Sequence, residues 1–164
     1  MTVRVLFIAA ATVLMALSAQ AQMGEKVVLH GLGGLQIDRT EVTIGQFDRY
    51  VQATGVRTRA EHEGGGFEYV AGWQRRPGWT WRQPDGVPAS PELPAVHLTH
   101  AEAAAYCQWA GGRLPTAAEW RRAAFTELRA APPAPWVRGH TYPWPTGESP
   151  QGANTSDPDP WPRA

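Results

Sequence analysis

Three short segments of the form Thr-x-x-Gln or Thr-x-x-Glu constrain the fold most, because each one specifies where a helix begins. They are Thr43–Gln46, Thr99–Glu102 and Thr116–Glu119. In such a capping box the threonine hydroxyl accepts a hydrogen bond from the amide three residues on, and the Gln or Glu side chain accepts one from the threonine amide. Apolar residues at helical spacing follow each box, so the sequence predicts three helices.

The ends of these helices are predicted from glycine positions and from loss of periodicity. The first helix is expected to end near Gly55, and the second near Ala110, just before a glycine pair. The third is expected to continue to about Arg129. Before the first helix, residues 34–42 alternate between apolar and polar side chains, which predicts a β-strand.

Two long regions show no regular period. Residues 64–94 are rich in Gly, Pro and Trp and are expected to form a long irregular connection with turns. Their tryptophans favour a packed connection, because disordered segments are poor in aromatic residues. From Pro132 onward Pro, Gly, Ser and Asp dominate, and no element that would close a sheet is expected. A truncated product without a stable fold is therefore kept as one interpretation.

The N-terminus has the three-part pattern of a secretory signal. A short positive segment precedes an apolar stretch over residues 5–17, and Ala19 and Ala21 occupy the positions that a signal peptidase reads. We expect a signal peptide over 1–21 and one domain over 22–164, with a non-cleaved anchor helix as the alternative. The mature protein would be periplasmic or secreted, and free of the membrane after cleavage.

Charge and cysteine content exclude several classes of protein. The formal net charge is +0, and no basic cluster favours nucleic acid or an anionic membrane surface. The one cysteine, Cys107, allows no internal disulfide. It is interpreted first as a small buried apolar residue, with an intermolecular bridge or a lost partner as alternatives.

The remaining titratable residues suggest no reaction. The five histidines lack the spacing of a metal site; they are His30, His62, His97, His100 and His140. The Glu61-His62-Glu63 segment is interpreted as solvated surface.

The longest motif lies between Pro94 and Trp120. It reads P-A-V-H-L-T, followed by A-Y-C-Q-W-A-G-G-R-L-P-T-A-A-E-W. It resembles the signature P-V-x-x-V-[ST]…A-Y-C-x-W-A-G-x-R-L-P-T-E-A-E-W of the formylglycine-generating enzyme (sulfatase-modifying factor) family. Further matches, the Trp81–Gly86 turn among them, extend the resemblance over residues 37–157. Trp109 and Trp120 each lie on a predicted short helix, and these large aromatic side chains are expected to pack the two helices against the loop-rich remainder of the domain.

The resemblance implies an irregular, loop-rich α+β fold related to C-type lectins. In the family a C-terminal portion carries a G-L-x-D-M-x-G-N-V-W-E-W motif and two cysteines that bind copper. Neither follows in this sequence, so the fold is expected to be C-terminally incomplete. Copper is not expected, because Cu(I) favours a pair of thiolates and Cys107 supplies one. In some members the cysteine matching Cys107 forms a disulfide with a distant C-terminal partner.

One metal ligand is carried over from the family. Asn154 matches an asparagine that helps to coordinate a structural calcium ion, and Asp157 and Asp159 are neighbouring oxygen donors. Calcium requires six to eight oxygen ligands. The resemblance assigns no catalytic and no cofactor-binding residue to this sequence, so calcium at Asn154 is its one cofactor hypothesis.

The leading functional hypothesis is an exported, non-catalytic accessory or binding module with an unidentified protein or peptide partner. The chain alone is not expected to be an enzyme. One alternative is a formylglycine-generating oxidase, or another oxidative maturation enzyme of this family, whose catalytic half is supplied elsewhere. The other is a truncated fragment. The Trp-rich connection is left open between a cleft for a peptide or sugar and a set of packed core tryptophans.

Overall fold

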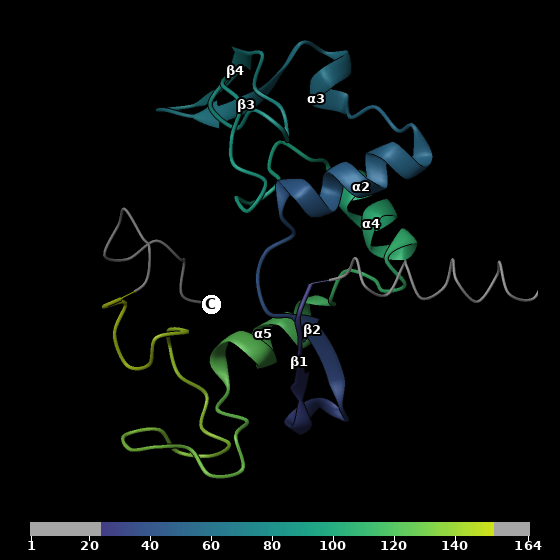
Figure 1. Ribbon diagram of the computed structural model, residues 1–164. Helices are drawn as coiled ribbons and strands as arrows, with labels where there is room; N and C mark the ends of the chain where they lie inside the picture. Colours follow the sequence, from purple (N-terminus) through teal and green to yellow (C-terminus); the bar gives the residue numbers. More distant parts are fainter. Residues whose placement is uncertain (1–23, 153–164) are drawn as a thin grey trace, which may run out of the picture. The chain divides into compact units, whose positions relative to one another are not determined.

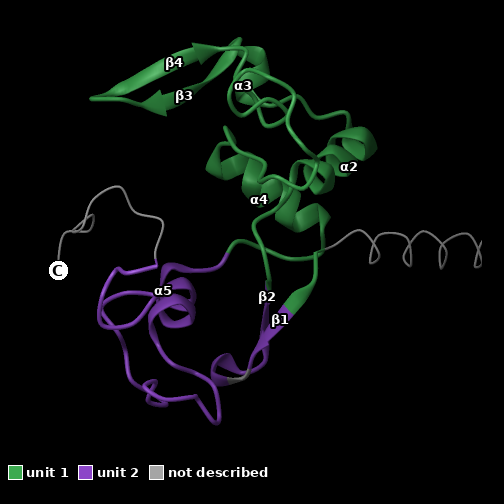
Figure 2. Ribbon diagram, turned by 60° about the vertical axis from the view of Figure 1, so that its left-hand side comes forward, with its two compact units in different colours: residues 1–26, 38–114 green, residues 27–37, 115–164 purple. Residues whose placement is uncertain are grey.

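The computed structural model describes residues 24–152, which divide into two compact units (Figure 2). Unit 1 comprises Asp38–Leu114 with the residues up to Lys26, and unit 2 comprises Val27–Ile37 and the chain from Pro115. The predicted signal peptide and the predicted calcium ligand Asn154, with Asp157 and Asp159, lie outside the described residues. Within 24–152 no helix is long and apolar enough to cross a membrane.

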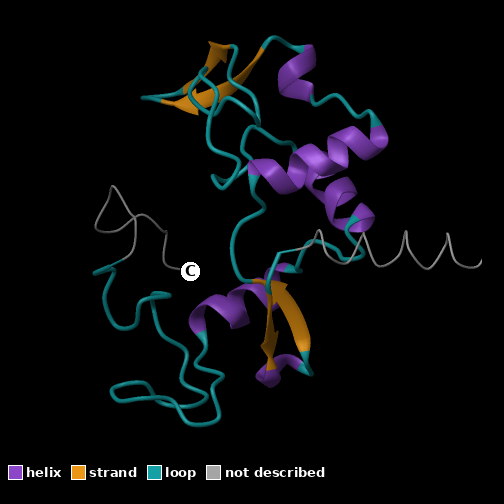
Figure 3. Cartoon of the chain, viewed as in Figure 1, coloured by secondary structure: helices purple, strands orange, loops and turns teal. Residues whose placement is uncertain are grey.

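Short helices alternate with two-stranded sheets, which confirms the predicted mixture of helix and strand (Figures 1 and 3). The elements in chain order are β1 (Lys26–Leu29), the 3-10 helix η1 (His30–Leu32), β2 (Leu35–Asp38), α2 (Ile44–Thr54), α3 (Arg59–His62), β3 (Gly65–Tyr69), β4 (Trp73–Pro77), α4 (His100–Trp109) and α5 (Ala117–Phe125).

All three predicted capping boxes are present. At the start of α2, Gln46 N donates to Thr43 Oγ1 over 3.2 Å, and Thr43 N donates to Gln46 Oε1 over 2.8 Å. The same reciprocal bonds open α4 at Thr99 and α5 at Thr116. The predicted end of α2 is also confirmed, because Gly55 adopts a left-handed conformation with φ 70°.

Two helix predictions need correction. Helix α5 ends at Phe125 rather than near Arg129, because Thr126 is extended and pairs with Thr141 in an isolated bridge. A fourth capping box, Thr58 with Glu61, opens the one-turn helix α3 and was not predicted. A helix of four residues is too short to show an apolar period, so only the Thr-x-x-Glu spacing could have indicated α3.

The strands differ more from prediction. The strand expected over 34–42 is limited to β2, and its partner β1 was not predicted. The connection expected to be irregular over 64–94 begins with an antiparallel hairpin, in which β3 pairs with β4 from Gly65↔Pro77 to Tyr69↔Trp73. Its tight turn uses Ala71 at φ 50° and Gly72 at φ 138°, a sequence that lacks the usual Asn-Gly or Asp-Gly signal.

The core of unit 1 is an aromatic cluster between α2 and α4, which pack against each other in Figure 1. Phe47 lies with its ring centroid 5.0 Å from Trp81 and 5.4 Å from Tyr50. Trp81 is fully buried and Phe47 is 1% exposed. The expectation that the Trp-rich connection is packed down is confirmed at Trp81. The ring centroids of Trp109 and Tyr50 lie 5.5 Å apart, which confirms the structural role expected for Trp109.

Unit 2 is held mainly by the contacts that follow α5. Tyr142 N donates to Phe125 O over 2.8 Å, and Glu127 N donates to His140 O over 2.9 Å. No helix or strand occurs among residues 132–152, as predicted for this Pro-rich stretch. The structural role expected for Trp120 is wrong, because its side chain is 56% exposed on α5.

The Glu127–Arg129 ion pair makes unit 2 sensitive to acid. Hydrogen bonds from Arg129 lower the pKa of the buried Glu127 carboxyl from 4.5 to about 2. A carboxyl with a lowered folded-state pKa stabilises the fold above its unfolded value, and this contribution disappears as the pH falls toward the folded value. We therefore expect denaturant midpoints of the wild type to fall between about pH 4.5 and pH 2 more steeply than those of Glu127→Gln. Glu41→Gln, at an exposed carboxylate, is the control, and equal slopes for all three proteins would contradict the prediction.

Candidate functional site

Unit 1 contains a cavity of about 310 Å³, here called the cleft. It lies between α3, the β3–β4 hairpin and residues 97–99. Its lining residues are Arg59, Ala60, Glu63, Gly65, Gly66, Phe67, Trp73, His97, Leu98 and Thr99. Its volume is at the lower end of the range typical of small-molecule pockets.

The N-terminus of α3 is capped by two carboxylates, Glu61 from α3 itself and Glu102 from α4. Thr58 is fully buried, and both its amide and its hydroxyl donate to Glu61 Oε2, over 2.7 and 2.8 Å. Glu102 of α4 accepts from Thr99 N over 2.7 Å and from Arg59 N over 2.6 Å. One carboxylate therefore satisfies the first amide of α3 and the N-cap amide of α4, which holds α3 and residues 97–99 of the cleft together.

Glu63 is the electrostatic centre of the cleft. Arg59 Nε donates to Glu63 Oε1 over 2.6 Å, and Arg75 contacts the other carboxylate oxygen while donating to Glu63 O over 2.7 Å. The hydrogen bonds from Arg59 and then Arg75 lower the pKa of Glu63, and the bond to Glu63 raises the pKa of Arg59. Two guanidinium groups thus share one carboxylate.

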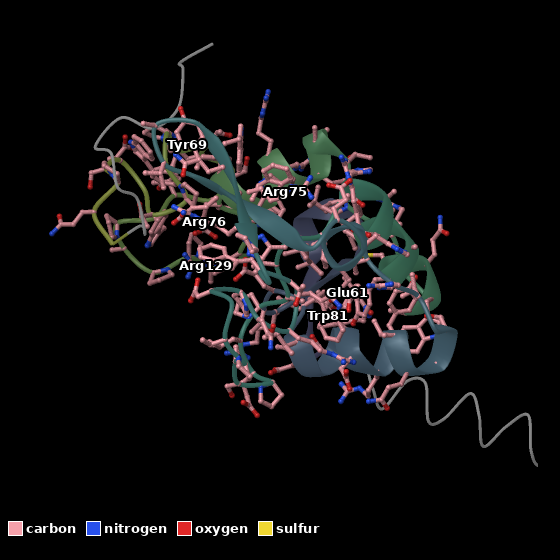
Figure 4. All side chains as sticks on the ribbon, turned by 90° about the horizontal axis from the view of Figure 1, so that it is seen from above. Glu61, Tyr69, Arg75, Arg76, Trp81 and Arg129 are labelled. Carbon is pink, nitrogen blue, oxygen red and sulfur yellow. The ribbon has the colours of Figure 1, made fainter. Side chains whose placement is uncertain are left out.

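The hairpin adds exposed aromatic rings to this charged group. Phe67, Tyr69 and Trp73 are 43%, 67% and 73% exposed, and alternation along the paired strands places them on one face with Arg75. The Tyr69 and Trp73 rings lie 5.4 Å apart, and the Arg75 guanidinium lies 4.9 Å from the Phe67 centroid. Tyr69 and Arg75 are labelled on the hairpin in Figure 4.

His97 closes the floor of the cleft in an unusual backbone conformation. Its φ is 57°, which is uncommon for a residue with a Cβ atom. Its Nε2 donates to Pro84 O over 2.9 Å, since a carbonyl oxygen can only accept. A Cβ atom on Gly66 would lie 2.4 Å from the His97 ring, so only glycine permits this close packing.

This arrangement is suited to binding rather than to proton transfer. One nitrogen of His97 is committed to the Pro84 carbonyl, and Glu63 is held ionised by two arginines. What remains accessible is an aromatic face next to guanidinium groups, a combination that recognises ligands through stacking and charge. The sequence left open whether the Trp-rich connection forms a cleft or packs its tryptophans in the core, and both occur, because Trp73 lines the cleft and Trp81 is fully buried. The hairpin that forms one wall was not predicted, because residues 64–94 show no regular period. The Gly64-Gly65-Gly66 triplet was the available signal.

The other histidines that were considered as metal ligands from the sequence do not lie together at one site. His62 and His100 are exposed, and His140 belongs to unit 2. Residues 61–63 lie at the surface as interpreted, because His62 and Glu63 are exposed and Glu61 is half-buried. Glu61 also caps α3, and Glu63 pairs with two arginines, roles that were not predicted. Across the described range 24–152, no group of three or more His, Cys, Asp or Glu side chains could hold a metal ion.

Cys107 lies half-buried on α4 and packs against the aromatic core. Burial is the main cause that raises the pKa of its thiol, and the negative charge of Asp38 adds to it. The thiol is therefore protonated at neutral pH, which is the unreactive form.

Known proteins match this chain over most of its length. The family model described as "Sulfatase-modifying factor enzyme 1-like domain" matches residues 4–161. The formylglycine-generating enzyme of Thermomonospora curvata is 36% identical over 137 residues, which cover 71% of this chain and 42% of the relative. The formylglycine-generating enzyme of Streptomyces coelicolor is 38% identical over 109 residues, covering 54% of this chain and 35% of the relative.

A relative described as inactive is also similar. The "Inactive C-alpha-formylglycine-generating enzyme 2" of Mus musculus is 34% identical over 129 residues, covering 66% of this chain and 39% of the relative. The chain thus spans less than half the length of each of these relatives. The resemblance carried by the Pro94–Trp120 motif is confirmed, and the chain belongs to the sulfatase-modifying factor enzyme 1-like family.

Proposed function

We propose that this chain is an exported, periplasmic or secreted binding module of the sulfatase-modifying factor family, with a protein or peptide partner held at the cleft. In this proposal it does not itself carry out an oxidation. Its loop-rich arrangement of short helices and small sheets is proposed to be of the C-type-lectin-like type. Family membership alone does not fix the reaction, because one scaffold can serve different functions.

The state of Cys107 is the observation that carries the proposal. It is the one thiol in the 164-residue sequence, it packs against the core, and its pKa is raised. A Cu(I) site built on soft ligands favours two neighbouring thiolates. The cleft, in contrast, offers exposed aromatic side chains and paired charges that suit recognition of a partner.

A formylglycine-generating oxidase that receives its catalytic half from another chain is the second candidate. The 36% identity to the Thermomonospora curvata enzyme favours it. In that case the present residues would provide part of the scaffold, and the copper ligands would come from the other chain.

One experiment tests whether this chain carries out the oxidation by itself. The purified chain would be titrated with Cu(I) against a chelating competitor and incubated with a cysteine-containing peptide and oxygen. We expect no competitive copper binding and no conversion of cysteine to formylglycine by mass spectrometry. Iodoacetamide is expected to label Cys107 at least about tenfold more slowly in the folded than in the denatured chain. Competitive Cu(I) binding that is lost in Cys107→Ser, together with peptide conversion, would overturn the proposal.

The binding role has its own test. Peptides selected from a displayed library on the purified chain should lose affinity about tenfold or more when Trp73 is replaced by alanine, because exposed aromatic anchors dominate such interfaces. Trp120→Ala, an exposed tryptophan of unit 2, is the matched control and should bind normally. Selected peptides that bind Trp73→Ala as well as the wild type would exclude the cleft as the partner site.

A further inference from the structure

Unit 2 contains a second cavity, of about 290 Å³, here called the unit 2 pocket. Its walls include the rings of Trp136, Tyr142 and His140, the apolar side chain of Val137 and the carboxylate of Glu148. It lies entirely within unit 2, so nothing in the cleft contributes to it.

The aromatic wall of the pocket is fixed by backbone contacts. Tyr142 is 8% exposed, its amide donates to Phe125 O over 2.8 Å, and its hydroxyl oxygen accepts from Val137 N over 2.9 Å. The Tyr142 ring centroid lies 4.8 Å from that of Trp136 and 4.5 Å from that of His140. The three rings are therefore held as one preorganised group.

A glycine turn holds Trp136 from the other side. Gly147 is buried with φ 112° and pairs with Trp144 in an isolated bridge. A Cβ atom at Gly147 would lie 3.2 Å from Cη2 of Trp136, so the turn touches the indole edge. The loop that carries Glu148 is thereby placed beside the aromatic rings.

The acidic side chain that lines the pocket is Glu148. The Glu148 side chain is 74% exposed, and its Oε1 lies 3.5 Å from Nε2 of His140. Arg129 lies with its guanidinium 5.8 Å from the Trp136 centroid, but it is paired with the buried Glu127. Glu148 is thus the charged side chain among the pocket's lining residues, and it remains accessible to a ligand.

We propose that the unit 2 pocket binds an organic ammonium cation. A cation is attracted to the faces of Trp, Tyr and similar rings, and most strongly where water is excluded. The rings supply that surface, and Glu148 supplies the opposite charge at the rim. A neutral ligand of the same shape would gain the apolar contacts but neither the ring nor the carboxylate attraction. This proposal goes beyond the partner site at the cleft and needs no copper chemistry.

The test compares a cation with its uncharged isostere on the whole chain. Choline and 3,3-dimethylbutan-1-ol have the same shape, and both would be titrated near neutral pH while the indole NMR signals are recorded. We expect choline to bind about tenfold more tightly and to shift the Trp136 signal, assigned by its loss in Trp136→Leu. Equal affinity for the two compounds, or no binding of choline, would overturn the proposal.

Matched variants identify the residues involved. Glu148→Gln and Trp136→Leu should each weaken choline binding about fivefold to tenfold. Glu41→Gln and Trp120→Leu remove an exposed carboxylate and an exposed tryptophan elsewhere, and both should bind choline as the wild type does. If Trp136→Leu does not fold, Glu148→Gln still tests whether this pocket binds choline, because it changes only an exposed side chain at the rim. Unchanged binding in Glu148→Gln would contradict the assignment. A failure here leaves the copper and peptide experiments unaffected.

Discussion

Replacement of Trp81 by alanine is expected to destabilise unit 1 by about 3–5 kcal/mol, the largest effect of any single substitution considered for this chain. Trp81 is fully buried against Phe47, and the guanidinium of Arg82 lies 4.4 Å from its ring. Alanine would leave a cavity of nearly the volume of an indole in a closely packed aromatic cluster. Because domains are stable by only about 5–15 kcal/mol, such a loss leaves little folded protein in mild denaturant.

The measurement is chemical denaturation followed by near-ultraviolet circular dichroism. Trp73→Ala is the matched control, because Trp73 belongs to the same unit but is 73% exposed, and its loss should change stability by less than about 0.5 kcal/mol. Trp81→Phe should cost clearly less than alanine. Within the described residues Trp81 Nε1 is buried without a hydrogen-bond partner, so phenylalanine removes an unsatisfied donor while keeping part of the packing. Equal midpoints for Trp81→Ala and Trp73→Ala would show that Trp81 is not the centre of this core.

Replacement of Gly65 by alanine is expected to disrupt the hairpin and the cleft together. A Cβ atom at Gly65 would lie 2.1 Å from Arg76 O, which belongs to the paired strand and cannot rotate away. The strands must separate locally to accommodate it. We expect a loss of about 1–3 kcal/mol in the free energy of unfolding, the usual cost of overpacking. Faster hydrogen exchange of the β3 and β4 amides should accompany this loss.

Gly112→Ala provides the control for backbone entropy. A Cβ atom at Gly112 would lie 3.7 Å from Cys107 O, an ordinary van der Waals distance. This substitution should be neutral or stabilise by up to about 1 kcal/mol, because alanine restricts the unfolded chain. If the β3 and β4 amides undergo hydrogen exchange as slowly in Gly65→Ala as in Gly112→Ala, the close strand contact at Gly65 is not important for the fold.

Local sequence sufficed for the starts of α2, α4 and α5, because a capping box is complete within four residues. Thr43, Thr99 and Thr116 each meet their Gln or Glu partner wherever the rest of the chain goes, and the structure has a helix at every one. The end of α5 is different. Nothing in residues 117–129 stops a helix, and it ends at Phe125 because Thr126 pairs with Thr141, which lies well along the chain.

The candidate sites depended on contacts that are distant in sequence. The cleft requires Glu102 to reach the amide of Arg59, 43 residues away, and Arg75 to reach Glu63. Neither pairing has a local signature, because surface charges of both signs are common. The family, in contrast, was identified from the Pro94–Trp120 motif alone, since many residues agree there in order and spacing.

By itself, the sequence determined the family, the starts of three helices and the presence of one thiol. Each of these depends on residue identity or on interactions between near neighbours. Only the tertiary structure decided that Trp81 is buried while Trp73 and Trp120 are exposed, and that the glycine triplet begins a strand. Burial and strand pairing are settled by which distant segments meet, and a tryptophan or glycine carries no local information about its future partner.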